Sequence, residues 1–559
     1  MQRSAQTFLF VATVVSTVFC HNATPAAEVV EADVVIYGGT SGGVVAAIAA
    51  SRAGKSVVIV EPGKHLGGMT AGGLSWTDIG SKPDYIRVLG GIAREVYTRI
   101  GAHYGMRPGS ELVVPTSNDP TRTGLDFPKP PSLSFEPKVA ETVFGELQKE
   151  SGAKVLFGAP LARVVKEGTR IHELETAQGD RIRGRVFIDA TYEGDLLAAA
   201  GVSHTIGREA NSQYGETVNG IQGPATNPRA GKFTVAVDPF LIAGKPTSGP
   251  LPYLLQPGDL GRAGAADNRV QSYNYRVTLT DRPENRRPIE PPANYRESDY
   301  ELLARWIEAR HRAGEELTLR SFLKYDPLQN RKYDFNNRGA ISTDFIGGAD
   351  RYPKATLAER GAIAKAHGDY LRGFFTFLAT SRRSPPAVRK EMSQFGLCRD
   401  EFTDNAGWPH QLYVREARRM IGSLVMTEQH ALGTKRVPKP VALATYGVDM
   451  HAVRRVIHNG QPVGEGTIGA AVPQPFPISY DALTPTAGEC DNLLVPFALS
   501  ASHVAFGAIR MEPTFMMLSE TAGTAAAIAA DADVPVQQVD YEQLRSRLQA
   551  NGAVLTWGK

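Results

Sequence analysis

DVVIYGGTSGGVVAAIAASRAGKSVVIVE, residues Asp33–Glu61, combines two strand-like runs with a glycine-rich turn and a stretch of small residues. Val34–Ile36 and Ser56–Val60 have the apolar composition of strands that are buried on both faces, as parallel sheets require. The small residues between them predict a helix that ends at Gly54. A strand, a glycine-rich turn, a helix and a second strand in this order are typical of a dinucleotide-binding unit.

The turn itself, Gly38-Gly39-Thr40-Ser41-Gly42-Gly43, departs at one position from the usual G-x-G-x-x-G pattern. Gly38 allows a sharp turn and Gly43 allows helix and strand to pack closely, but Thr40 replaces the middle glycine and brings a β-carbon toward the phosphates. The amides at the helix start favour a diphosphate. Glu61 follows Gly38 by 23 residues, near the spacing of roughly 20 at which an acid reaches an adenosine ribose.

A second glycine pair follows this acid, in Pro62–Met69 (PGKHLGGM). Gly67 and Gly68 are similar to a pair that passes close to the cofactor in proteins that bind FAD, whereas nicotinamide dehydrogenases have no need of it. His65 lies in the same segment without the spacing of histidines that carry a covalent flavin. We therefore expect non-covalent FAD.

These motifs resemble the FAD-dependent oxidoreductases of the glutathione-reductase-like fold, and in particular a secreted bacterial group of unassigned substrate. The resemblance covers nearly the whole mature chain, through FEPKVAETVF (Phe135–Phe144), VFIDATYEGDLLAAAGV (Val186–Val202), GREANSQYGET (Gly207–Thr217), GWPHQLYVREARRMIG (Gly407–Gly422) and NLLVPFALSASHVAFGAIRMEPTFMMLSETAGTAAAIA (Asn492–Ala529). It implies an α/β fold with a Rossmann-type FAD-binding domain, and an oxidoreductase that uses FAD.

The pattern of strands predicts that the FAD-binding domain is discontinuous. We expect a first part over residues 28–202, an inserted α+β substrate domain over 203–480, and a C-terminal return over 481–559. Three later strands are predicted: one at Lys154–Phe157, one that ends near Ala190, and one at Asn492–Val495. A helix is predicted from about Thr514 to Ala530, with Pro513 in its first turn. The residues expected to complete the FAD site from these later segments are Ala190, Thr191, Ser502 and Pro513.

Residues 203–480 are richer in aromatic, Arg, Asn and Pro residues, as expected of a substrate domain. Helices are predicted at Leu357–Phe377 and Glu416–Thr427. The proline-rich segments Thr280–Tyr295 and Asn118–Ser132 are predicted to be surface loops.

Composition excludes several classes of protein. A chain of 559 residues exceeds one ordinary core, which favours two domains. The formal net charge of +3 provides no basic stripe of the kind that a nucleic-acid binder needs. No apolar run approaches the roughly 20 residues of a membrane span.

The N-terminus has the features of a secretory signal peptide over residues 1–27. Arg3 precedes an apolar stretch from Phe8 to Cys20, and small residues follow up to Ala27. We therefore expect a periplasmic or secreted protein. A lipoprotein anchored through Cys20 is the minor alternative, since Phe19 stands where a small residue would be expected. The two remaining cysteines, Cys398 and Cys490, form either a disulfide or two buried thiols.

The C-terminal return contains the first group of expected catalytic residues. Arg510 and a helix N-terminus could stabilise the negative charge of a reduced flavin. His503 could take or give the proton that accompanies hydride transfer. The alternatives are structural: His503 ties its loop by hydrogen bonds, and Arg510 pairs with Glu512 or Glu520.

A second group lies around the predicted helix that begins near Arg415. Arg415 and Arg419 would lie one turn apart on that helix, where like charges repel unless an anion lies between them. An acidic group of the substrate could supply that anion, and so could Glu416, Asp404 or Glu401. His410 and Tyr413 are secondary acid–base candidates. Asp449 and His451 form an Asp-x-His pair that could be a proton relay, a metal ligand or a surface hydrogen bond; no metal site is expected, because a third ligand is missing.

The sequence therefore predicts an FAD-dependent oxidoreductase that moves a hydride between a small polar extracellular substrate, such as a carbohydrate hydroxyl or an organic acid, and flavin N5. Its rivals are a non-redox isomerase or lyase that acts on a sugar, and a non-catalytic flavin- or carbohydrate-binding protein. No second dinucleotide fingerprint is present, which argues against a pyridine-nucleotide disulfide reductase and leaves the electron acceptor and the oligomeric state open.

Overall fold

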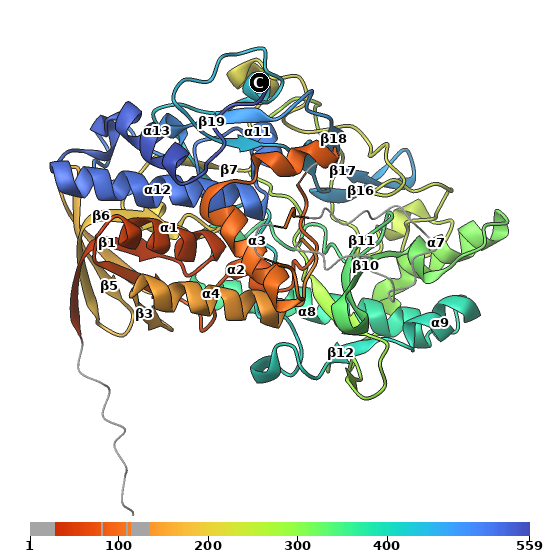
Figure 1. Cartoon of the computed structure of the whole chain (residues 1–559). Coiled ribbons are helices and arrows are strands. Elements are labelled where there is room, and N and C mark those ends of the chain that lie inside the picture. The colour runs from red at the N-terminus through yellow and green to blue at the C-terminus, as the bar shows by residue number, and fades with distance from the viewer. Residues whose placement is uncertain (1–27, 80–81, 108–109, 113–132, 559) are drawn as a thin grey trace, which may run out of the picture.

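The two larger β-sheets of the protein lie in different parts of the molecule (Figure 1). The computed structural model describes residues 28–79, 82–107, 110–112 and 133–558. The expected signal peptide with Cys20 and the expected loop Asn118–Ser132 lie outside these residues. Across the described ranges, no helix is both long enough and apolar enough to cross a membrane.

The first sheet contains seven strands: β1 (Val29–Tyr37), β2 (Val57–Glu61), β3 (Lys154–Phe157), β4 (Leu161–Glu167), β5 (Arg170–Thr176), β6 (Arg181–Asp189) and β20 (Leu493–Leu494). Their order is β3-β2-β1-β6-β5-β4, with β20 beside β6. β1 runs parallel to β2 and β6, and β20 is also parallel to β6, while β4, β5 and β6 pair antiparallel. The three predicted later strands are confirmed, and the sheet is of the predicted Rossmann type.

The helices near this sheet are α1 (Ser41–Arg52), α2 (Gly68–Ala71), α3 (Gly91–His103), α4 (Pro137–Ser151), α5 (Asp195–Ala199), α12 (Glu512–Ala532) and α13 (Tyr541–Ala550). α11 (His503–Ile509) packs against β15 (Val448–Met450) and α10 (Glu428–Ala431) instead. α12 contains Pro513 in its first turn, as predicted, and packs along α1. A β-carbon added at Gly523 would lie 2.3 Å from the backbone oxygen of Ala46, so the two helices touch through small residues. α11 was not predicted; a loop was expected there.

The second sheet contains five strands in the order β10-β11-β8-β12-β9. They are β8 (Val277–Thr280), β9 (Arg286–Arg287), β10 (Leu323–Leu328), β11 (Lys332–Asn337) and β12 (Gly396–Cys398), and the helices nearby are α7 (Glu301–Arg312), α8 (Leu357–Thr380) and α9 (Pro386–Met392). α8 confirms the helix predicted at Leu357–Phe377. The predicted loop Thr280–Tyr295 is interrupted by β9, which forms one edge of this sheet.

Shorter elements connect the two sheets: β7 (His204–Ile206), α6 (Asn211–Tyr214), β13 (Arg418–Met420), α10 (Glu428–Ala431), β14 (Pro440–Ala444), β15 (Val448–Met450), β16 (Arg454–His458), β17 (Gln461–Glu465), β18 (Ile468–Ala470) and β19 (Phe476–Ser479). The remaining strands pair as β7 with β13, β14 with β19, β15 with β18 and β16 with β17.

The helix predicted at Glu416–Thr427 is wrong. Residues Arg418–Met420 form β13, which pairs antiparallel with β7, so Arg415 and Arg419 do not lie one turn apart on a helix. The physical reason is tertiary pairing: Arg419 is fully buried and bonds to the carboxylates of Glu209 and Glu416. The helix-like spacing of charges therefore reflects ion pairs made with distant residues.

The two cysteines settle the alternative left open by the sequence. Cys398 and Cys490 are both free and buried, so they are two thiols rather than a disulfide.

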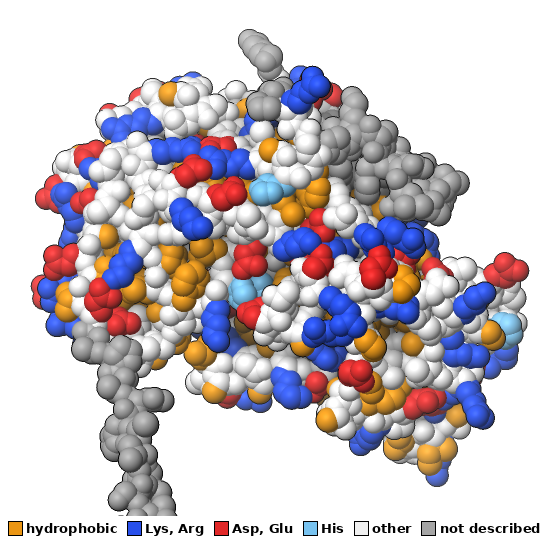
Figure 2. All heavy atoms as spheres, turned by 60° about the horizontal axis from the view of Figure 1, so that its bottom comes forward, with side chains coloured by type: hydrophobic (Ala, Val, Ile, Leu, Met, Phe, Trp, Pro, Cys, Tyr) orange, Lys and Arg blue, Asp and Glu red, His pale blue; other side chains and the backbone are white. Residues whose placement is uncertain are grey.

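On the face that Figure 2 shows, Lys and Arg side chains are interspersed with Asp and Glu side chains.

Candidate functional site

The glycine-rich turn lies at the carboxyl ends of β1, β2 and β6, where doubly wound sheets bind their ligands. Gly38 has a φ of +103°, which favours glycine. A β-carbon added at Gly43 would lie 2.0 Å from the backbone oxygen of Gly38, so this helix can approach the strand only with glycine there. Thr40 caps α1, since its hydroxyl accepts from Gly43 N at 3.1 Å and donates to the backbone oxygen of Ala190 at 2.8 Å. The threonine thus ties the turn to the end of β6.

The start of α1 is suited to bind an anion. The amides of Ser41 and Gly42 have no acceptor among the described residues, as expected at a helix N-terminus that faces a phosphate. Glu61 Oε2 accepts from Gly39 N at 2.6 Å, which places its carboxylate at the turn. Burial raises the pKa of Glu61, against the opposing effect of the Gly39 and Gly63 amides. This donor and acceptor set fits the diphosphate and ribose of an adenine dinucleotide.

The second glycine pair lies directly against this turn. Gly67 N donates to the backbone oxygen of Gly39 at 2.8 Å. An added β-carbon at Gly68 would lie 3.2 Å from Thr40 Cα and 2.5 Å from the hydroxyl of Tyr192. Met69 N donates to that same hydroxyl at 2.8 Å. The two glycine motifs and the segment after β6 therefore form one site.

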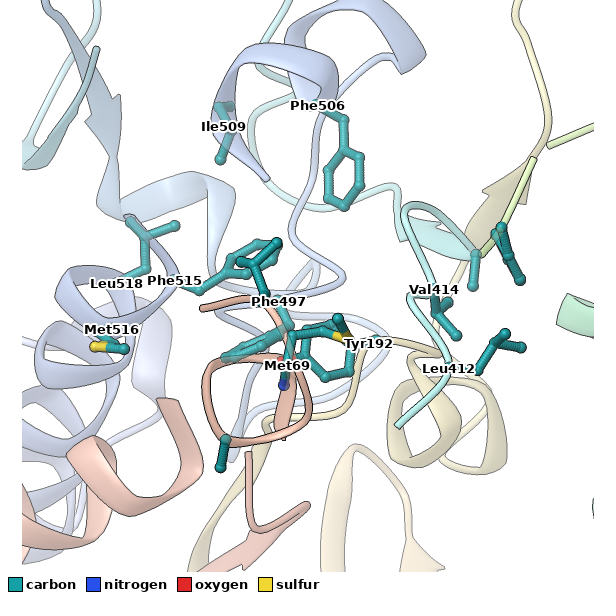
Figure 3. Close-up of a cluster of buried hydrophobic side chains, with 14 of the residues drawn as sticks. Met69, Tyr192, Leu412, Val414, Phe497, Phe506, Ile509, Phe515, Met516 and Leu518 are labelled. Carbon is teal, nitrogen blue, oxygen red and sulfur yellow. The ribbon is translucent and has the colours of Figure 1, made fainter. Parts of the chain in front are cut away.

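An aromatic cluster adjoins the glycine motifs (Figure 3). The rings of Phe497 and Phe515 stack at 4.3 Å between centroids, and the Tyr192 ring meets Phe497 edge-on at 5.1 Å. Figure 3 shows Met69 beside Tyr192 and Phe497, so side chains from the first and last parts of the chain pack together here.

A buried carboxylate, Glu512, joins three helices at this place. At the start of α12, it accepts hydrogen bonds from Ser41 Oγ at 2.6 Å, Thr70 Oγ1 at 2.6 Å and Tyr192 OH at 2.8 Å. Burial raises the pKa of Glu512, while these three donors oppose the increase. This role of Glu512 was not predicted from the sequence, where the only local indication is its position before Pro513 at the start of an apolar helix.

A polar cavity of about 160 Å³ lies where the C-terminal return meets the segments around the second sheet. The charged side chains that line it come from distant parts of the chain: Asp78, Arg276, Lys324, Asp344, Arg415, Asp449, His451 and Arg510. Two of the cations are already paired outside the cavity lining, Arg276 with Asp334 and Lys324 with Asp326.

Arg415 and Arg510 are the cations of the cavity lining that have buried guanidinium nitrogens without a hydrogen-bond partner among the described residues. Arg510 is 4% exposed and donates to Tyr413 OH at 3.1 Å and to the backbone oxygen of Asp449 at 2.6 Å, but its Nε has no partner among the described residues. Arg415 is 2% exposed, and its Nε and Nη2 also lack hydrogen-bond partners there. Nη2 lies 3.0 Å from Asp344 Oδ1, but the two groups are not aligned for a hydrogen bond. Burial lowers the pKa of Arg415.

His451 is oriented by a carboxylate on the wall of the same cavity. Its Nδ1 lies 2.7 Å from Asp344 Oδ2, and its Nε2 lies 3.6 Å from Asp449 Oδ2. Burial alone would raise the pKa of Asp344, but Arg415 and His451 hold it below its usual range. In the neutral form of the imidazole, the proton is on Nδ1, which donates to the Asp344 carboxylate, and Nε2 is the acceptor.

Three of the five expected catalytic residues, Tyr413, Arg415 and Arg510, line this cavity. His503 does not line it; it is fully buried, with Nδ1 2.9 Å from Glu416 Oε1 and Nε2 unpartnered among the described residues. His410 also lies elsewhere, stacked on His65 at 3.7 Å between ring centroids. Burial lowers the pKa of His410 to about 4. Arg510 does not pair with Glu512 or Glu520, which were the structural alternatives.

Of the expected cofactor residues, those of the two glycine motifs lie together with Glu61, Ala190 and the start of α12 at Pro513. Ser502 does not join them. It caps α11 by accepting from Ala505 N at 3.2 Å, and it donates to Glu216 Oε1 at 2.5 Å.

One group of acidic residues in the described chain has the spacing of metal ligands, Glu136, Asp400 and Glu401. The ammonium group of Lys332 lies among them, 2.6 Å from Glu136 Oε1 and 2.9 Å from Asp400 Oδ2, with Glu401 also in contact. A lysine therefore supplies the positive charge at this cluster.

The parallel sheet, the glycine turn against its carboxyl edge and the acid after β2 define a dinucleotide-binding unit of the Rossmann type. Residues 33–548 match the family of FAD dependent oxidoreductases, and the chain belongs to that family. FAD is its cofactor, and the glycine motifs and Glu61 fit the adenosine diphosphate half of that molecule.

Solved structures resemble only part of the chain. L-proline dehydrogenase from P. horikoshii is 21% identical, with a TM-score of 0.25, over 33% of this chain and 59% of that one. 3-Ketosteroid-Δ4-(5α)-dehydrogenase from Rhodococcus jostii RHA1 is 18% identical, with a TM-score of 0.20, over 32% and 50%. THI4 from Thermovibrio ammonificans is 21% identical, with a TM-score of 0.21, over 32% and 66%. The chain thus matches about half to two thirds of the length of these proteins. A comparison with curated proteins gives no match.

Proposed function

We propose that this enzyme oxidises a small polar extracellular molecule in the cavity between Arg415, Arg510 and His451. The observation that carries the proposal is the composition of the cavity wall. Charged and hydrogen-bonding side chains surround a volume of about 160 Å³. Two residues of the wall, Arg510 and Met511, immediately precede the helix that contacts the glycine motifs. Such a wall favours a compact molecule that carries several polar groups.

FAD, when bound, supplies the acceptor for a hydride. The glycine-rich turn and Glu61 would hold its adenosine diphosphate half without a covalent bond. The cavity residues bind and orient the substrate, and the low exposure of Arg415 and Arg510 keeps bulk water from their guanidinium groups. His503, Tyr413 and His410 stay predicted acid–base residues, and of these Tyr413 is on the cavity wall.

Anaerobic mixing tests the proposal. The holoenzyme is mixed without oxygen with a panel of polyols, sugars and hydroxy acids, and flavin absorbance is followed. Net oxidation of a substrate bleaches the flavin, and we expect bleaching with at least one member of the panel. An isomerase or lyase would turn over substrate with the oxidised absorbance unchanged, and a binding protein would do neither.

The location of the protein is part of the proposal. The features of residues 1–27 support export, with cleavage near Ala26 or Ala27. Fractionation of the producing cells, with N-terminal sequencing of the product, tests this. A mature protein that begins at Cys20 would favour the lipoprotein instead.

A further inference from the structure

We propose that the substrate is a hydroxy acid whose carboxylate is bound by Arg415 and Arg510 and whose hydroxyl proton passes to His451. This inference rests on the proposed oxidation and specifies the class of its substrate. It covers small hydroxy acids and the acidic derivatives of sugars, and it excludes their neutral counterparts.

The free donors of the two arginines carry the first half of the argument. Buried polar groups in native proteins nearly always have hydrogen-bond partners, so each exception calls for an explanation. Three guanidinium nitrogens of residues that line the cavity, Nε and Nη2 of Arg415 and Nε of Arg510, are buried without a hydrogen bond among the described residues. A planar carboxylate matches the fork of a guanidinium group and would satisfy these donors.

The surroundings of Arg415 support an anion rather than a neutral ligand. Its nearest carboxylate, on Asp344, is shared with His451 and is misaligned for a hydrogen bond to Nη2. Its other contacts are the backbone oxygen of Ser272 and the face of the Tyr413 ring, 4.7 Å from the guanidinium carbon. Burial of the charge costs free energy that these contacts do not fully offset, as the lowered pKa of Arg415 indicates.

The position of His451 carries the second half of the argument. Arg415 and His451 contact the two different oxygens of one carboxylate, that of Asp344. A ligand held by the guanidinium group therefore lies beside the imidazole. Nδ1 contacts the Asp344 carboxylate, so in the neutral imidazole Nε2 is the acceptor, and at 3.6 Å from Asp449 Oδ2 it lies beyond hydrogen-bond distance.

The reaction balances with FAD as the oxidant. The carbon–hydrogen bond breaks and its electron pair leaves as a hydride, which FAD accepts. The oxygen–hydrogen bond breaks, its electron pair forms the carbonyl of an oxo acid, and the proton goes to Nε2 of His451. Proton transfer by a positioned histidine contributes about 10²–10⁴-fold to such a rate.

Matched pairs of ligands test the carboxylate. The holoenzyme is titrated anaerobically with lactate and 1,2-propanediol, glycerate and glycerol, and gluconate and glucose, and both flavin bleaching and the shift of the unfolding temperature are recorded. We expect the acid of at least one pair to bind and bleach, with its neutral partner at least 10-fold weaker. Equal effects of neutral and acidic partners would overturn the inference and leave the proposed oxidation standing. If no compound bleaches the flavin, the proposed function fails. A stabilising shift by the acids alone would then still support the carboxylate site. The absence of any shift would overturn the carboxylate site as well.

Variants separate the two roles. Arg415→Gln should weaken the stabilising shift by the acid 10-fold or more, and Arg415→Lys should retain part of it. His451→Gln should slow bleaching by about 10²-fold or more while the acid still shifts the unfolding temperature. Arg372→Gln is the matched control, because Arg372 lies over the Trp408 ring and does not line the cavity. FAD content and far-UV circular dichroism identify a misfolded variant. If Arg415→Gln is misfolded, binding of the acid by Arg415→Lys tests the role of Arg415 instead. Unchanged binding in a folded Arg415 variant would overturn the inference.

Discussion

Gly43 shows how a single residue controls the FAD site. A β-carbon there would lie 2.0 Å from the backbone oxygen of Gly38, and a backbone atom cannot move aside by a change of rotamer. We expect Gly43→Ala to destabilise the protein by about 1–3 kcal/mol or more and to lower the FAD content of the purified protein. Gly145→Ala is the control, because Gly145 also lies in a helix and an added β-carbon meets nothing within 4 Å; it should gain up to about 1 kcal/mol. Absorbance at 450 nm per protein, with chemical unfolding, measures both, and normal FAD content in Gly43→Ala would contradict the prediction.

Glu520 makes the stability of the protein depend on pH. It is buried on α12, where Oε2 accepts from Ile92 N at 2.8 Å and Oε1 has no partner among the described residues. Burial raises its pKa to about 7. The folded state therefore holds the proton more tightly than the unfolded state, so this contribution to stability is complete below pH 4.5 and is lost as the pH rises through about 7.

Glu520→Gln removes this dependence. The unfolding free energy of the variant relative to that of the parent protein should rise by up to about 3 kcal/mol as the pH is raised from 4.5 to 8, at 1.36 kcal/mol per pKa unit. Urea unfolding at several pH values measures the difference. Glu316→Gln, at an exposed position, should show little change with pH. A difference between Glu520→Gln and the parent that is the same at pH 5 and pH 8 would refute the pKa assignment.

At the residue scale, the sequence predicted the positions whose requirement is local. Gly38, Gly43 and Glu61 are set by the turn and by the spacing to the next strand, and the structure places them together. Glu512 and Tyr192 could not be predicted in this way, because their partners lie hundreds of residues away in the chain.

At the scale of elements, α12 links the end of the chain to its beginning through Glu512. Replacement by Ala removes the acceptor of three buried hydrogen bonds, and each donor left unsatisfied costs about 1–3 kcal/mol. We expect Glu512→Ala to unfold at a clearly lower temperature and to release FAD before it unfolds, because Ser41 and Thr70 belong to the helices of the glycine motifs. Flavin fluorescence during heating detects the release.

Thr356→Ala serves as the control for this element. It removes the capping box of α8, which should cost about 1 kcal/mol, but it leaves the glycine motifs untouched. FAD should then be released only together with unfolding. Early FAD release in both variants would mean that general destabilisation, rather than the loss of Glu512, frees the cofactor.

The elements also show where sequence patterns mislead. α8 and α12 were predicted because their composition and first turns suit a helix whatever surrounds them. The segment Glu416–Thr427 was predicted wrongly, because its buried charges are neutralised by partners such as Glu209 rather than by solvent or by neighbours on a helix. Pairing of β13 with β7 outweighs helix propensity there.

At the scale of the whole molecule, the site is assembled from the two ends of the chain. β20 joins the sheet beside β6, and α12 lies along α1. The cavity is lined by residues as distant as Asp78 and Arg510, so no spacing in the sequence could have defined its wall. The expected domain boundaries at residues 202 and 480 stay a prediction.

FAD should therefore stabilise the whole fold, and its phosphates should supply most of the effect. The glycine turn, the free amides of Ser41 and Gly42 and the Glu61 carboxylate all suit the adenosine diphosphate half. A ligand that binds only the folded state adds about 2.7 kcal/mol at a free concentration of 100 times its Kd. We expect the FAD-free protein to unfold several degrees lower, FAD to restore the loss, ADP to restore part of it, and riboflavin to restore little. Thermal unfolding with each ligand at equal concentration measures this order, and stabilisation by riboflavin equal to that by FAD would mean that the glycine turn does not bind the phosphates.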